Sequence, residues 1–171
     1  MKKLVFILSA VVFLTATQSI TAQSKSIVDI AVGNKDFSTL VTALKAADLV
    51  GALQGDGPFT VFAPNNAAFE KVDSKALANL LKPENKKALA NVLTYHVVSG
   101  KYAAADVMKV LKKNGGTVEL TALNGQTFKV RKGTDGIYLK DSTGNYSKII
   151  STDIMANNGV IHVIEEVVMP K

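Results

Sequence analysis

Cysteine is absent from the 171 residues of this chain. Its absence excludes disulfides, thiolate metal sites and cysteine nucleophiles, as well as the acylated cysteine that anchors bacterial lipoproteins. Tryptophan is absent too, and aromatic residues make up only 6% of the chain. We therefore expect a core of Val, Leu, Ile and Ala with Phe as filler, which has to stabilise the fold without cross-links.

Histidine and arginine are scarce. The chain has two histidines, His96 and His162, and one arginine, Arg131. Two histidines without cysteine or a Glu-x-x-His pattern make a poor metal site, so we expect neither a metal nor a cofactor. Each histidine is interpreted first as a structural residue with its ring nitrogens hydrogen-bonded within the fold.

The formal net charge of +6 comes from lysines that are scattered along the sequence. Scattered charge is typical of a solvated surface, whereas a nucleic-acid interface concentrates arginine and aromatic residues on one element. We therefore expect no nucleic-acid partner. Weak attraction to acidic glycans or anionic surfaces stays open.

Residues 1–22 have the pattern of a secretory signal peptide. Lys2 and Lys3 precede an apolar run over residues 4–14, which is too short to span a bilayer well. A polar stretch over residues 15–19 follows, and the small residue Ala22 suits the position before a cleavage site. We predict cleavage after Ala22 and an exported chain that is secreted, periplasmic or at the cell surface, with no transmembrane segment once mature.

The remaining chain changes from helix-like to strand-like near its middle. Apolar residues at helical spacing predict a helix that starts at the N-cap Asp36 and stops near residues 49–51. Another predicted helix opens at Pro83 and buries a stripe of four side chains: Ala88, Leu89, Val92 and Leu93.

Strand-like patterns dominate from Thr117 to the end, after an earlier strand at residues 59–62. Asn124-Gly125 predicts a hairpin turn, because both positions tolerate positive φ. The last run, residues 160–168, is long and apolar, which favours a central strand. No Pro, Gly or Ser linker divides the two halves, so we predict one α+β domain over residues 26–171.

Four stretches in order resemble the signature boxes of the fasciclin domain family. They are residues 57–69, 93–100, 123–126 and 158–164, the last running on to Pro170. One departure is Glu165, where the family commonly has Asp. The resemblance implies β-strands forming a wedge with a helical bundle packed against it. It also implies a secreted or surface-associated adhesion or recognition module, as in periostin-like matrix proteins, that binds a cell-surface or matrix protein or a glycan.

The resemblance also implies two candidate binding pairs. Tyr95 and His96 lie in the second box, at a predicted helix-to-strand junction, where they either form part of a binding face or pin the junction. Asp153 and Ile154 resemble an Asp-Ile pair implicated in receptor binding by animal relatives. The alternative for that pair is a turn Asp followed by a buried Ile.

Two other functions stay open, and neither is favoured. A carrier of a small apolar ligand would need a large open cavity between helices and sheet. A hydrolase would need His96 within hydrogen-bond reach of Ser99. Ser99 has no nucleophile elbow and no Gly-rich oxyanion loop beside it, so we expect no enzyme.

Overall fold

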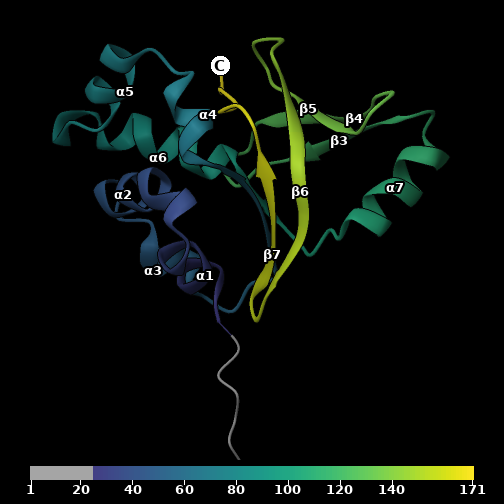
Figure 1. Ribbon diagram of the computed structural model, residues 1–171, viewed down its shortest axis with the longest axis horizontal. Helices are drawn as coiled ribbons and strands as arrows, with labels where there is room; N and C mark the ends of the chain where they lie inside the picture. Colours follow the sequence, from purple (N-terminus) through teal and green to yellow (C-terminus); the bar gives the residue numbers. More distant parts are fainter. Residues whose placement is uncertain (1–24) are drawn as a thin grey trace, which may run out of the picture.

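The computed structural model describes residues 25–171, so the predicted signal peptide and its cleavage after Ala22 lie outside the described residues (Figure 1). The described chain forms helices α1 (Ile27–Gly33), α2 (Ser38–Ala46), α3 (Val50–Leu53), α4 (Asn66–Glu70), α5 (Ser74–Leu80), α6 (Lys86–Tyr95) and α7 (Ala104–Lys113), with 3-10 turns η1 (Lys35–Phe37) and η2 (Pro83–Asn85). Its strands are β1 (Phe59–Pro64), β2 (Val97–Ser99), β3 (Thr117–Thr121), β4 (Thr127–Lys132), β5 (Ile137–Lys140), β6 (Tyr146–Ala156) and β7 (Gly159–Ile164).

Short polar side chains start several of the helices. Ser26 and Asp29 form a reciprocal capping box at α1, in which each side chain accepts a hydrogen bond from the other residue's backbone N–H. The side chain of Asn65 accepts from Ala68 N at α4, and that of Asp73 accepts from two N–H groups at α5. These caps satisfy amides that the helices leave unpaired.

The boundaries predicted for the helix from Asp36 to residues 49–51 are wrong. Asp36 lies inside η1, and α2 begins after Phe37 without a side-chain cap. The chain leaves helical geometry at Asp48, where φ is 60°, before the short helix α3. The predicted stripe on α6 is also partly wrong, because Ala88 is exposed while Leu89 and Leu93 are buried. Consecutive helical residues point about 100° apart, so Ala88 falls beside the buried stripe.

The strands form one seven-stranded sheet in the order β2-β1-β7-β6-β5-β4-β3. β1 and β7 pair in parallel, and the other neighbours are antiparallel. An isolated bridge from Val98 to Ala122 brings β2 to the end of β3, so the sheet curls back on itself. β7 is central and all six of its residues are buried, but it ends at Ile164 and not at residue 168.

The curl produces two apolar clusters, one on each face of β1 and β7. Helices α1, α2, α3 and α6 cover one face, where Val61 and Ile161 point toward Phe37 and Leu40. On the opposite face, inside the curl, Phe62 and other residues pack with strands β4 and β5 and with α7. Figure 1 shows helices α1 to α6 on one side of β7 and α7 on the other. The predicted α+β class is confirmed.

Candidate binding surfaces

Tyr95 lies at the end of α6 and is completely buried. Its hydroxyl donates a hydrogen bond to Thr127 O at 3.0 Å and accepts one from Ser142 N at 3.1 Å. The ring packs edge-on against Phe128, with centroids 5.7 Å apart. Burial raises the pKa of the Tyr95 phenol. Tyr95 therefore ties α6 to β4 and to the turn between β5 and β6.

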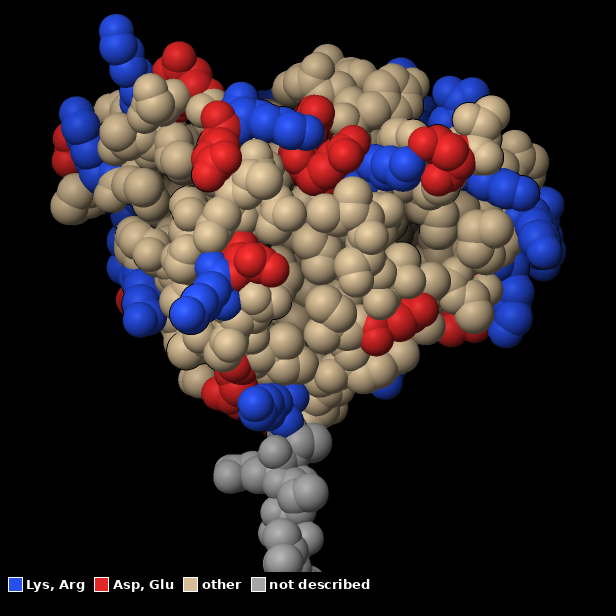
Figure 2. Space-filling view, in the orientation of Figure 1, with Lys and Arg blue, Asp and Glu red and all other residues tan. Residues whose placement is uncertain are grey.

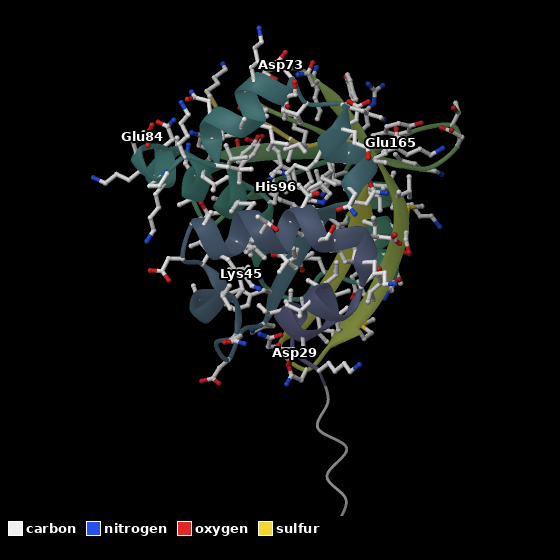
Figure 3. The ribbon with its side chains drawn as sticks, turned by 60° about the vertical axis from the view of Figure 1, so that its left-hand side comes forward. Asp29, Lys45, Asp73, Glu84, His96 and Glu165 are labelled. Atoms are coloured by element: carbon white, nitrogen blue, oxygen red, sulfur yellow. The ribbon has the colours of Figure 1, made fainter. Side chains whose placement is uncertain are left out.

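His96 follows directly and is also buried. Its Nδ1–H donates to Val92 O at 2.8 Å, and its Nε2 accepts from Val168 N at 3.2 Å, which fixes a neutral tautomer. Burial lowers the pKa of His96 to about 4. Figure 3 shows His96 inside the molecule, while Asp73 and Glu84 project from the surface. Both ring nitrogens are engaged, so His96 does not activate Ser99 as a hydrolase would require.

His162, on β7, connects two further segments. Its Nε2–H donates to Tyr102 O at 2.8 Å, and its Nδ1 accepts from Asp153 N at 3.3 Å. The histidine is buried, and burial lowers its pKa. The interpretation of His162 as a buried histidine bonded to the backbone is confirmed.

Asp153 and Ile154 lie where β6 bulges as it pairs with β7. Asp153 has a φ of 59°, and its Oδ1 accepts a hydrogen bond from Ala104 N at 2.8 Å. Because α7 has no side-chain cap from its own N-cap residue Ala103, the Asp153 carboxylate caps this helix from the sheet. Ile154 is half-buried against the helical cluster. The binding role of Tyr95, His96, Asp153 and Ile154 stays a prediction.

Large apolar side chains flank that bulge on the outside. Ile150 is 49% exposed and Met155 is 51% exposed, both on β6. In Figure 1, β6 runs the full height of the molecule in front of the other strands. The bulge therefore presents apolar surface beside a carboxylate.

Basic side chains that are scattered in the sequence gather on the outer face of β4 and β5. Lys129 faces Lys140 directly across the strand pair, and Lys140 faces Tyr146 of β6. Arg131 lies two residues from Lys129, on the same face of β4. Sequence reasoning missed this cluster. The alternation of buried Phe128 and Val130 signals the outward face of β4, but the β4 to β5 register is not visible in the sequence.

The interior offers little room for a ligand. The apolar void between α1, α2 and β1, lined by residues such as Phe37, Leu40 and Val61, measures about 20 Å³. A space of that size holds roughly one water molecule. Between residues 25 and 171, no three acidic or histidine side chains come close enough to hold a metal ion. No helix in the same part of the chain combines the length and hydrophobicity needed to span a bilayer.

These features define a class of protein: an α+β domain with a curled seven-stranded sheet, buried histidines and a charged outer strand face. The sequence model of the Fasciclin domain matches residues 35–170. The protein sll1483 of Synechocystis sp. is 48% identical over 154 residues, which cover 90% of this chain and 78% of that protein. A second Synechocystis protein, sll1735, is 42% identical over 144 residues, or 84% of this chain and 97% of its own length.

More distant similarity extends to animal proteins. Transforming growth factor-beta-induced protein ig-h3 of Sus scrofa is 34% identical over 156 residues, which cover 91% of this chain but only 21% of that protein. Among solved structures, the FAS1 domain pair of the insect cell adhesion molecule Fasciclin I superposes with a TM-score of 0.75 at 17% identity. That match covers 85% of this chain and 51% of the insect one, and it bears on the fold alone. The chain belongs to the fasciclin domain family, whose members include cell adhesion modules.

Proposed function

We propose that this protein is a secreted or surface-associated recognition module that binds proteins or glycans outside the cytoplasm, without catalysing a reaction. The observation that carries the proposal is membership of a family with adhesion modules over residues 35–170. The N-terminal pattern of residues 1–22 supports export.

The geometry of the interior bears on the two alternatives, a carrier and a hydrolase. A carrier would need a cavity far larger than the water-sized void between the helices and β1. A hydrolase would need a free ring nitrogen on His96, and both are engaged with the backbone of Val92 and Val168. A recognition module needs only a stable exterior, so it fits these observations best.

Within this proposal, the contact surface for a protein partner is the bulged segment of β6. Ile150 and Met155 supply exposed apolar area, and Asp153, which is half-buried and accepts from Ala104 N, lies between them in the sequence. An apolar patch beside a charge is a common composition for a recognition surface. Tyr95 and His96 contribute as positioning residues, because they hold Ser142 and Val168 from inside the fold.

A binding screen tests the proposal. The chain from Gln23 to Lys171, immobilised, is presented with arrays of surface proteins and glycans. We expect at least one partner with a Kd of about 1 µM or tighter, in the range of specific recognition. Failure to find any partner at that strength, together with turnover of an array compound, would overturn the proposal.

Paired variants locate the surface. Ile150→Ser with Met155→Ser is expected to weaken a protein partner at least about tenfold, since a few buried side chains dominate most interfaces. The matched control is Val32→Ser with Leu123→Ser, because these side chains are 58% and 45% exposed but lie elsewhere. Equal losses in the two pairs would remove β6 as the contact surface.

A further inference from the structure

The outer face of strands β3 to β6 carries two rows of side chains that run across the sheet. One row is Glu119, Lys129, Lys140 and Tyr146, each directly opposite the next. The neighbouring row is Thr117, Arg131, Tyr138 and Lys148. Adjacent strands lie roughly 4.8 Å apart, so the charges of one row are closely spaced.

Two of these lysines oppose each other without a balancing acid in contact. Lys129 and Lys140 form a directly opposed pair, an arrangement that destabilises a sheet. The salt bridges within residues 25–171 join Lys71, Lys86, Lys109 and Lys148 to acidic groups, and none includes Lys129, Arg131 or Lys140. Glu119 lies opposite Lys129 but not within salt-bridge distance. Within the described residues, the face therefore keeps a cluster of positive charge that no salt bridge neutralises.

An aromatic ring borders the cluster. Tyr146 is 42% exposed, and Lys140 Nζ lies 5.2 Å from its ring centroid. Lys140, and to a smaller extent Arg131, lower the pKa of the Tyr146 phenol. Both cations thus lie close to one exposed ring, which offers a flat surface next to positive charge.

Two shallow hollows join these basic side chains into one continuous surface. The first is lined by Gly116, Lys129, Arg131, Lys132, Lys140 and Tyr146, among others. The second continues from Lys129 and Lys140 to the turn at Thr143 and Gly144. Asp141 borders this second hollow, but its carboxylate already accepts hydrogen bonds from Thr143, Asn145 and Met169. The result is an open path whose charged lining residues are basic except for Asp141.

We propose that this face binds an anionic polysaccharide, with its carboxylate or sulfate groups on Lys129, Arg131 and Lys140 and a sugar ring on Tyr146. The positive charge of the face favours an anionic partner, and two hollows that share Lys129 and Lys140 suit a polymer that extends from one to the other. The inference rests on the proposed function, since export places the domain among such polymers. Lysine outnumbers arginine here, which favours diffuse charge contacts over the bidentate phosphate contacts typical of nucleic-acid binding.

Charges are arranged differently on the face of the molecule that Figure 2 draws. On the face drawn in Figure 2, acidic and basic residues alternate along the upper edge and much of the centre is uncharged. Lys45, Lys75 and Lys87 are exposed and lie in helices α2, α5 and α6, outside this sheet. They supply a matched control with the same change in charge.

The test measures affinity of the chain from Gln23 to Lys171 for immobilised polygalacturonate and dextran sulfate, with neutral dextran as the blank. We expect both acidic polymers to bind, with affinity falling as salt rises. The triple variant Lys129→Gln, Arg131→Gln, Lys140→Gln should lose about tenfold or more in affinity. The control Lys45→Gln, Lys75→Gln, Lys87→Gln should lose no more than about threefold.

Further measurements distinguish the possible anionic polymers. They also distinguish a failure of this inference from a failure of the proposed function. Tyr146→Ser should weaken polygalacturonate binding without a change in charge. Equal losses in the two triple variants would overturn the inference, as would tighter binding of duplex DNA or of phosphatidylserine vesicles to the same face. The Ile150→Ser, Met155→Ser variant should keep its polysaccharide affinity. If the chain binds no acidic polysaccharide but still binds a partner from the protein and glycan arrays, this inference is wrong and the proposed function is supported.

Discussion

The segments that match the family signatures and the outer face of β3 to β6 differ in where their side chains lie. Phe62, Tyr95 and His162 belong to signature segments, and all three are buried. Lys129 and Arg131 belong to none of those segments, and both are exposed. The signatures therefore specify how the domain is built. The outward charges of Lys129 and Arg131 lie outside those segments, so the family motif does not predict them.

The strongest way to sharpen this comparison is to truncate a signature residue. Tyr95→Ala should lower the free energy of unfolding by about 4 kcal/mol, since it removes a buried ring and leaves a cavity. Urea denaturation of the chain from Gln23 to Lys171 measures the loss. If the cost is below about 1 kcal/mol, Tyr95 is not the interior anchor that its contacts describe.

Tyr95→Phe separates the ring from the hydroxyl. This variant keeps the packing against Phe128 but leaves Ser142 N and Thr127 O without their partner. We expect a loss of about 1 to 2 kcal/mol. A binding defect in Tyr95→Phe at unchanged stability would move Tyr95 from the interior role to a binding role.

Lowering the pH should reduce the free energy of unfolding through the buried histidines before it changes the charge of the basic outer face. The pKa of His96 falls from 6.5 in the unfolded chain to about 4 in the fold, so the unfolded chain takes up the proton more readily. Stability is therefore full above about pH 6.5 and falls as the pH drops toward 4. The His96 contribution to this loss is about 2 kcal/mol by pH 5, and His162 acts in the same direction.

Denaturation curves at pH 7.5, 6 and 5 measure how steeply the free energy of unfolding changes with pH. His96→Gln serves as the control, because the amide does not titrate. The free energy of unfolding of this variant should depend less on pH than that of the wild type, although it should be lower at pH 7.5. The carboxylates Asp29 and Asp135 have lowered pKa values and titrate below this window. A flat wild-type profile between pH 6.5 and 5 would contradict the neutral, buried state of His96.

Much of the fold was open to prediction from the sequence because local signals agreed. The hairpin turn predicted at Asn124-Gly125 joins β3 to β4, but only Gly125 takes a positive φ, of 83°, and Asn124 does not. The strand after Asn158 proved central, since an uninterrupted apolar run suits a strand buried on both faces. The signature boxes supplied the family, which the comparisons confirmed.

The features that the sequence left unpredicted at these sites depend on long-range contacts. Nothing near Asp153 in the sequence reveals that its carboxylate caps α7, because Ala104 lies 49 residues away. The same holds for Lys129 and Lys140, which meet only through the register of β4 and β5. Local periodicity predicts which side chains share a face of one strand, but not which strand lies beside it.

Asp153 links β6 to the start of α7, and its removal has an intermediate effect. Asp153→Ala removes the acceptor for Ala104 N and places a less tolerant residue at a φ of 59°. We expect a loss of about 1 to 2 kcal/mol, typical of a lost cap. Asp153→Asn keeps an acceptor and tolerates this backbone, so it should lose less. Hydrogen exchange at the first amides of α7 reports the cap directly, and unchanged exchange in Asp153→Ala would contradict the capping role.

The smallest expected effect on stability tests the other side of the comparison. Replacing Lys129 and Lys140 with Gln removes a directly opposed pair of like charges, so the free energy of unfolding should stay constant or rise by less than about 1 kcal/mol. Interior variants lose stability, whereas this one keeps it and is expected to lose polysaccharide affinity. A sheet that retains repulsion at no structural benefit is the pattern expected where the charges serve a ligand. Measured destabilisation of the double variant would show instead that the two lysines support the fold, and the contrast between interior and outer face would fail at this point.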